Sequence, residues 1–139
     1  SLDPDVSLWN TSSVKSLHQT FLRINGNPDV SNWNTSNVEV MSNTFQQSVN
    51  VDPDLSNWDF SKITGMGYFL NSATSLAVEN YSKFLIKLES STALNNQQLY
   101  DIQTKYNTSA AAARASLVSR GWTINDLGIK SEQKGLGRF

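Results

Sequence analysis

The chain lacks cysteine altogether, and it contains a single histidine and three prolines. Without cysteine it has no disulfide, no thiolate metal site and no cysteine nucleophile. His18 has no second histidine with which to share a metal ion, and no G-x-S-x-G nucleophile motif is present. The sequence therefore predicts a protein that is not an enzyme, with no catalytic, cofactor-binding or metal-ligating residues.

An excess of charge of one sign is also missing. Charged residues make up 17% of the 139 residues, and the formal net charge is -1. Such a chain has no basic field to attract phosphate backbones or anionic lipid. No apolar run approaches the length that crosses a bilayer. We expect neither nucleic acid as a partner nor membrane insertion by this segment.

What the chain does contain is a segment of eleven residues in three versions, SLWNTSSVKSL, SNWNTSNVEVM and SNWDFSKITGM, which begin at Ser7, Ser31 and Ser56. Equivalent tryptophans are 24 and then 25 residues apart. A period of this length indicates units that stack on one another, because one unit is too small to bury its own apolar face. The predicted repeat core consists of Trp9, Trp33, Trp58, Val14, Val38, Ile63, Leu17, Met41, Met66, Phe21, Phe45 and Leu70.

Each repeat unit is predicted to contain a turn, a short strand and a short helix. Proline between acidic or amide residues indicates the turn, and Val6, Val30 and Leu55 alternate with polar residues as in a strand. Apolar residues at helical spacing then follow a serine, so helix N-caps are predicted at Ser12, Ser36 and Ser61. The expected fold class is an α/β solenoid of short parallel strands and short helices.

The pattern changes after Leu70. Tyr81, Phe84, Leu85 and Leu88 have the spacing of a longer amphipathic helix. An alanine-rich stretch predicts a second helix that is capped by Ser109, and short strands are expected around residues 99–102 and 122–125. We therefore predict three solenoid repeats in residues 1–70, a helical capping unit in 71–128 that closes the solenoid, and a polar tail in 129–139.

Three stretches carry a family resemblance: PDLSNWDFSKITGMGYFL from Pro53, PDVSNWNTSNVEVMSNTF from Pro28 and AAAARASLVSRGWTIND from Ala110. They resemble the BspA-like, leucine-rich-type repeats of bacterial surface proteins, as in mycoplasmal and listerial surface lipoproteins. The matching parts cover most of residues 3–128. The resemblance implies a leucine-rich-repeat-like solenoid in an extracellular or cell-surface location. Because the chain opens inside a unit, we also expect N-terminal truncation and further repeats upstream.

Two sets of residues have a structural and a binding interpretation. The tryptophans would form either a stacking surface for sugar rings or part of the core, and recurrence in register with aliphatic residues favours the core. The residues around the prolines would supply either calcium ligands or turn hydrogen bonds, and turn chemistry is favoured. These residues are Asp3, Asp5, Asn27, Asp29, Asp52 and Asp54.

The resemblance implies adhesion or recognition, with no shared catalytic site. The expected function is a non-enzymatic module that binds an unidentified protein or glycan through the solenoid surface. A contact surface would be formed by positions that vary between the units, such as Lys15, Glu39, Gln46, Gln47 and Lys62. The alternative is a structural or assembly component of a larger extracellular protein or of a phage tail or fibre.

Overall fold

Regular secondary structure in the computed structural model lies in the second half of the chain, within the described residues 5–131. The elements are helix α1 (Val78–Ser91), strand β1 (Gln98–Leu99), the 3-10 helix η1 (Thr108–Ala110), helix α2 (Ala111–Ser119) and strand β2 (Thr123–Ile124). Strands β1 and β2 pair in parallel. Asp3, Pro4 and the part of the predicted tail from residue 132 onward lie outside the described residues.

The predicted fold class, a leucine-rich-repeat-like solenoid of short strands and short helices, is wrong. Residues 5–77 contain turns, bends and isolated bridges but neither a helix nor a strand. Parallel bridges join Ser16 to Val40 and Val40 to Gly65, where the sequence predicts the start of each helix. The stretches predicted as strands, around Val6 and Val30, are turns and extended chain.

The physical reason is that left-handed residues interrupt every predicted helix. In the second unit, Asn43 and Gln47 have φ angles of 61° and 59°. A right-handed helix cannot continue through such residues. Val38, Met41 and Phe45 keep their helical spacing in the sequence because the chain turns between them, and all three are buried.

Backbone hydrogen bonds connect each unit to the next. The N–H groups of Leu17, Gln19, Phe21 and Arg23 donate to the carbonyls of Val40, Ser42, Thr44 and Gln46 at 2.8–3.2 Å. The second unit repeats this pattern toward the third unit, from Met41, Asn43, Phe45 and Gln47 to Gly65, Gly67, Phe69 and Asn71. We call the surface formed by residues 15–23, 39–47, 64–72 and 98–103 the ladder face. Backbone bonds between units thus replace those of a helix.

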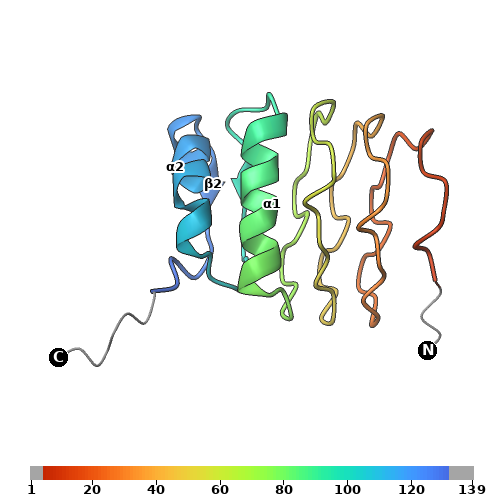
Figure 1. The fold of residues 1–139 in the computed structure, drawn as a ribbon, viewed down its shortest axis with the longest axis horizontal. Helices are drawn as coiled ribbons and strands as arrows, with labels where there is room; N and C mark the ends of the chain where they lie inside the picture. The colour runs from red at the N-terminus through yellow and green to blue at the C-terminus, as the bar shows by residue number, and fades with distance from the viewer. Residues whose placement is uncertain (1–4, 132–139) are drawn as a thin grey trace.

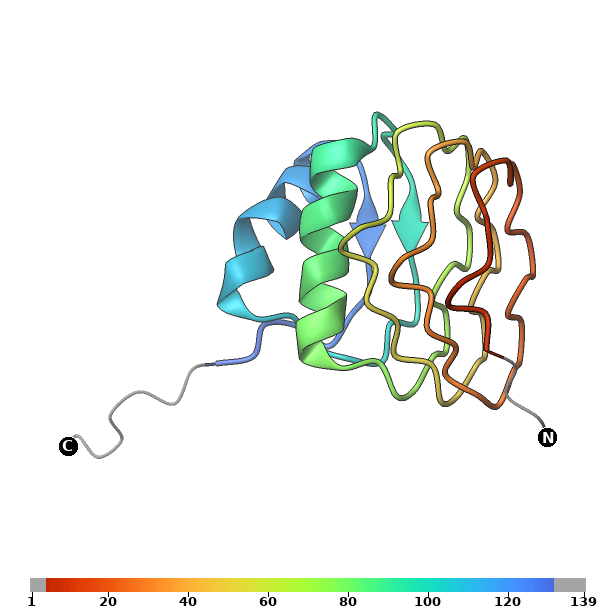
Figure 2. The same ribbon diagram turned by 45° about the vertical axis from the view of Figure 1, so that its right-hand side comes forward.

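The units lie side by side in one row. Figures 1 and 2 show the coils of the first, second and third units next to one another, followed by α1 and then α2. Helix α1 contains the four apolar residues from whose spacing it was predicted, and all four are buried. They are Tyr81, Phe84, Leu85 and Leu88. Neither helix of residues 5–131 has the length and apolar character of a membrane span.

Aromatic rings stack from unit to unit through the core. The ring centroids of Trp9 and Trp33 lie 6.3 Å apart, as do those of Trp33 and Trp58, and the rings of the second pair are parallel within 3°. Phe21 stacks on Phe45 at 5.5 Å. Each buried indole donates its Nε1 hydrogen to the preceding unit, from Trp33 to the Val6 carbonyl at 3.0 Å and from Trp58 to the Val30 carbonyl at 2.9 Å.

Most residues of the predicted repeat core lie in the interior. Leu17, Phe21, Trp33, Val38, Met41, Phe45, Trp58, Ile63, Met66 and Leu70 are buried. Val14 is partly buried and packs against them. The prediction for Trp9 is wrong, because its side chain is 59% exposed. Trp9 has a stacking partner on one side, Trp33, and no described residue stacks on its other side.

Replacing Trp58 with alanine should cost about 3–5 kcal/mol of unfolding free energy, because its side chain is fully buried between two units. Trp9→Ala is the matched control and should cost less than half as much, because most of that side chain is exposed. Urea unfolding followed by circular dichroism measures both variants. Equal losses would contradict the packing described here.

Candidate binding surface

On the ladder face, the backbone conformation recurs from unit to unit, but the residue types at equivalent positions differ. Gln19, Asn43 and Tyr68 occupy equivalent positions, and their φ angles are 58°, 61° and 59°. A second column, four residues further on, consists of Arg23, Gln47 and Ser72, with φ angles of 57°, 59° and 61°. The backbone conformation is therefore the same in successive units, while the chemistry of the outward side chain changes from one unit to the next.

Aromatic and amide side chains stand out on this face. Tyr68 is 53% exposed and Tyr100 is 40% exposed. Arg23 Nε donates to Gln47 Oε1 at 2.6 Å, and a ring nitrogen of His18 lies 3.2 Å from the Ser42 carbonyl oxygen. The surface thus combines exposed aromatic area with polar groups whose positions are fixed by contacts between units.

The five variable positions fall into two groups. Lys15, Glu39 and Gln47 are exposed on the ladder face. Gln46 is half-buried and accepts a hydrogen bond from Asn43 at 2.6 Å, so it supports the turn. Lys62 lies outside the ladder face and donates from Nζ to Asn37 Oδ1 at 3.0 Å. The sequence did not single out Tyr68, Gln19 and Arg23, although a comparison of equivalent positions would have shown that they differ in every unit.

Acidic residues next to the prolines accept hydrogen bonds within their own turns. Asp29 Oδ1 accepts from the Ser31 amide at 3.1 Å and from the Ser31 hydroxyl at 2.7 Å. Asp5 with Ser7 and Asp54 with Ser56 repeat this arrangement. Asp52 and Asn27 are also used, because Asn27 Oδ1 accepts from the Asp52 amide at 2.9 Å. The bonds between aspartate and serine are those of the turn interpretation, whereas the bond between Asn27 and Asp52 joins two units.

The serines predicted as helix caps have a different role. The amides of Ser12, Ser36 and Ser61 donate to the side chains of Asn10, Asn34 and Asp59 two residues earlier, and no helix follows them. The prediction for Ser109 is wrong in the same way. Its amide donates to Asn107 Oδ1 at 3.1 Å, and Asn107 is the N-cap of η1. In all four cases the side chain that accepts the hydrogen bond belongs to the residue two positions before the serine, and only Asn107 caps a helix.

These hydrogen bonds lower the pKa of three surface carboxyl groups. The side chain and amide of Ser31 stabilise the charged form of Asp29, and Ser7 and Ser56 do the same for Asp5 and Asp54, so each pKa lies below its usual value of 3.8. Since the folded-state pKa is depressed, the stabilisation is present above the unfolded-state pKa and is lost as the pH falls through the folded-state value.

Replacing Asp5, Asp29 and Asp54 together with asparagine should flatten the acid dependence of stability. Asparagine keeps the turn hydrogen bond, as Asn34 does with Ser36, but it does not titrate in this range. Urea midpoints measured between pH about 6 and about 2.5 should fall less steeply in the triple variant than in the parent chain. An unchanged slope would show that these carboxylates do not govern acid unfolding.

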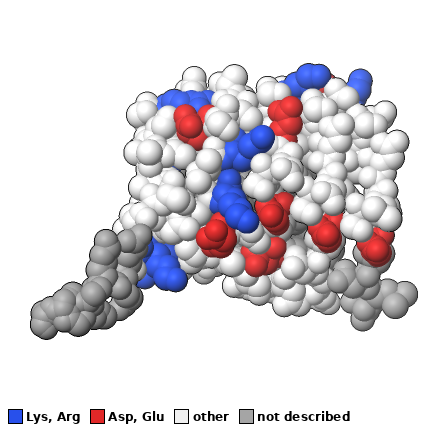
Figure 3. Space-filling model, viewed as in Figure 1, with Lys and Arg blue, Asp and Glu red and all other residues white. Residues whose placement is uncertain are grey.

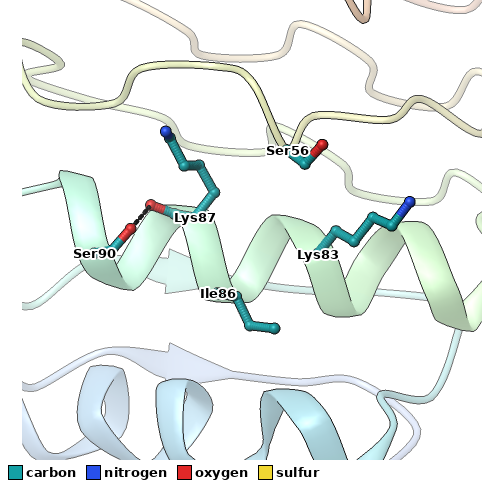
Figure 4. Close-up of a pocket in the computed structure, with 5 residues that line it drawn as sticks. All are labelled: Ser56, Lys83, Ile86, Lys87 and Ser90. Atoms are coloured by element: carbon teal, nitrogen blue, oxygen red, sulfur yellow. Dashed lines mark hydrogen bonds between the residues drawn. The ribbon is translucent and has the colours of Figure 1, made fainter.

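A shallow groove lies between α1 and the third unit. It has a volume of about 170 Å³ and is lined by Ser56, Lys83, Ile86, Lys87 and Ser90. Figure 4 shows that Lys83 and Lys87 extend toward the loop of Ser56, whereas Ile86 points the other way. Figure 3 shows basic and acidic side chains next to one another over the middle of this face.

The charges of the groove are already matched. Lys83 Nζ lies 3.7 Å from Asp54 Oδ2. Burial raises the pKa of Asp59, but hydrogen bonds from Ser61 and the charges of Lys87 and Lys62 outweigh it, so the pKa is lowered overall. Both lysines therefore face carboxylates of the third unit. The groove offers neither net charge nor depth, and the ladder face is the better candidate for binding.

A charged network connects α1, α2 and the segment after β2. Arg114 donates to Asp126 through both Nε and Nη2, at 2.9 and 3.0 Å, and the Tyr81 hydroxyl donates to Asp126 at 2.7 Å. The guanidinium also lies 4.9 Å from the ring centroid of Tyr106. Burial, together with the charge of Asp126, raises the pKa of Tyr81. Sequence reasoning missed this network because its members are far apart in the chain.

Asp126→Ala should cost about 3 kcal/mol or more of unfolding free energy, because the Asp126 side chain is fully buried and its loss leaves the charge of Arg114 without its partner. Lys83→Ala, which breaks the exposed pair with Asp54, is the matched control and should cost less than about 1 kcal/mol. Denaturant titrations of the two variants provide the comparison. A loss from Asp126→Ala as small as that of the control would contradict a structural role for the network.

Comparison with known proteins identifies one family. A family model described as "Mycoplasma protein of unknown function, DUF285" matches residues 1–113. No curated protein and no solved structure matches the chain. The match includes the three repeat units and extends through η1 into α2.

Proposed function

The chain belongs to DUF285, a family of Mycoplasma proteins of unknown function, and we propose that it is a non-enzymatic recognition module that binds protein or glycan through the ladder face. A bacterial repeat protein fits this role well, because repetition supplies an extended surface. The resemblance of the units to BspA-like surface repeats supports an extracellular or cell-surface location. That resemblance concerns the motifs and the location, and it does not extend to a leucine-rich-repeat fold.

The observation that carries the proposal is the constant backbone beneath changing side chains. Gln19, Asn43 and Tyr68 share one backbone conformation, although their side chains are two amides of different length and a phenol. Residues in left-handed positions are strained unless the surrounding structure determines them, and here the hydrogen bonds between units do so. The side chain at such a position differs between units while the backbone conformation stays the same. A recognition surface needs this separation of scaffold and contact residues.

The composition of the face indicates the kind of ligand. Exposed tyrosines provide contact area at low entropic cost, and amide side chains provide adaptable hydrogen bonds. Aromatic faces also suit the apolar face of a sugar ring. Lys15, Arg23, Glu39 and Asp101 balance one another in charge, so a neutral glycan or a mixed-charge protein surface fits better than a polyanion.

An assembly component is the second candidate. The end of the row at the first unit favours it, because this end presents backbone carbonyls that accept no hydrogen bond from a described residue and the exposed side chains of Leu8 and Trp9. Gene neighbours that encode virion tail proteins would support this candidate, whereas a signal peptide or wall anchor in the parent gene would support the recognition module.

Tyr68→Asn combined with Tyr100→Ser should weaken ligand binding at least about tenfold, because the change removes the largest exposed side chains of the ladder face. Asparagine suits the left-handed position of Tyr68, as Asn43 shows at the equivalent position. Glycan arrays and immobilised extracellular-matrix proteins serve as probes.

The control variant is Val118→Ser. Val118 is an exposed apolar residue on α2, away from the ladder face, so this variant should bind the ligand as the parent chain does. Equal binding by the tyrosine variant and the control would place the contact surface elsewhere. Absence of binding to every glycan and protein on the panel would count against recognition as the function.

A further inference from the structure

The hydrogen bonds of the ladder face have a direction. At alternate residues from Leu17 to Arg23, the N–H group points toward the second unit, and the carbonyls that receive these bonds belong to Val40, Ser42, Thr44 and Gln46. The second unit donates to the third in the same sense. Each unit therefore presents a row of acceptors on one side and a row of donors on the other.

In the first unit, the acceptor row faces no partner among residues 5–131. The equivalents of Val40, Ser42, Thr44 and Gln46 are Ser16, His18, Thr20 and Leu22, and none of their backbone carbonyls accepts a hydrogen bond from a described residue. The corresponding carbonyls of the second and third units are all used. This end of the row is thus a regular array of open acceptors, spaced two residues apart.

The apolar side of the same end is also open. Trp33 and Trp58 each donate from Nε1 to a valine carbonyl of the preceding unit, whereas the Trp9 indole has no such acceptor among the described residues. Trp9 is 59% exposed, and the neighbouring Leu8 is 91% exposed. One indole donor, one aromatic face and four carbonyls are therefore available at a single end.

We propose that this end is an interface that receives another unit of the same repeat pattern, packed by its donor side. We call it the acceptor end, defined by Leu8, Trp9 and the carbonyls of Ser16, His18, Thr20 and Leu22. Such a unit would supply N–H groups at four alternate residues, a carbonyl for the Trp9 indole and a ring to cover Trp9. The inference concerns a different surface from the ladder face and does not depend on the proposed ligand.

The contacts between the units that are present indicate that the partner of the acceptor end is another unit. The contact between the first and second units and the contact between the second and third units both combine the four-bond ladder, the indole bond and the stacked tryptophans. An added β-strand from an unrelated protein would supply N–H groups but neither the carbonyl for the indole nor the ring over Trp9. A helix would have no free N–H groups along its length.

The test extends the chain by one unit. A copy of residues 28–51 is placed directly before Asp3, which recreates the Val-Asp-Pro junction that precedes the third unit. The control carries the same added residues in shuffled order. Hydrogen exchange of the Trp9 indole Nε1–H is followed by NMR with nitrogen-labelled tryptophan, and Trp9→Phe in each protein assigns the signal.

In the extended chain, the Trp9 indole hydrogen should exchange at least about tenfold more slowly than in the parent chain and in the shuffled control, because it gains a buried acceptor. Trp9→Ala should also lower the unfolding midpoint more in the extended chain than in the parent. Unchanged exchange, or an equal effect of Trp9→Ala in both chains, would overturn the proposal.

A second copy of the chain is the competing occupant. Sedimentation velocity of the parent chain over a range of concentrations detects it, with indole exchange measured on the same samples. A monomer with a rapidly exchanging Trp9 indole at all concentrations supports the proposal. Self-association that protects the Trp9 indole in the parent chain would show that the acceptor end takes a second copy instead, and would overturn it.

Discussion

The backbone hydrogen bonds between adjacent units are the interaction on which the rest of the structure depends. In a helix or a hairpin the peptide groups find partners close by in the sequence, but here the donors at Leu17, Gln19, Phe21 and Arg23 find theirs about one repeat further on. A unit therefore cannot satisfy its own backbone. Since unpaired buried peptide groups cost free energy, order in one unit requires order in its neighbour. The tryptophan column reinforces this dependence, because the indoles of Trp33 and Trp58 bond to carbonyls of the unit before.

The sequence was enough to predict which residues of successive units are equivalent, but it did not predict the backbone conformation within a unit. The columns of Trp33 with Trp58 and of Met41 with Met66 identify residues that share an environment, and these residues are buried. The sequence did not predict the left-handed conformation of Asn43 and Gln47. Residues other than glycine seldom adopt it. Gln19 and Arg23 do so while their N–H groups donate to the next unit, and Tyr68 does so between two residues whose carbonyls accept bonds from the second unit. Helical spacing alone was therefore an unreliable guide.

The candidate surface shows the same division. The turn residues could be assigned from their types, since aspartate or asparagine two positions before a serine forms a hydrogen bond within one short stretch, such as the bond from Ser31 to Asp29. The pairing of Arg114 with Asp126 and Tyr81 joins three segments, and no local pattern announces it. Tyr68 on the ladder face was missed because the prediction treated its segment as helix and did not anticipate the left-handed turn at this residue.

Helices appear in the chain where the dependence on a neighbour's backbone is reduced. Helix α1 satisfies its own peptide groups, yet its start is attached to the repeats, because the Ala77 amide donates to Asp52 Oδ1 at 2.9 Å, just as the Asp52 amide donates to Asn27 Oδ1. The indole contact also continues, since Trp122 Nε1 donates to the Leu94 carbonyl at 3.0 Å. The two ends of the row are consequently different in kind. The end at Trp9 presents backbone carbonyls and one face of an indole ring. The end at α2 contains a helix whose peptide groups are largely hydrogen-bonded within the helix. The proposed interface at Trp9 would extend the row at one end, while the ladder face keeps its backbone and varies its side chains.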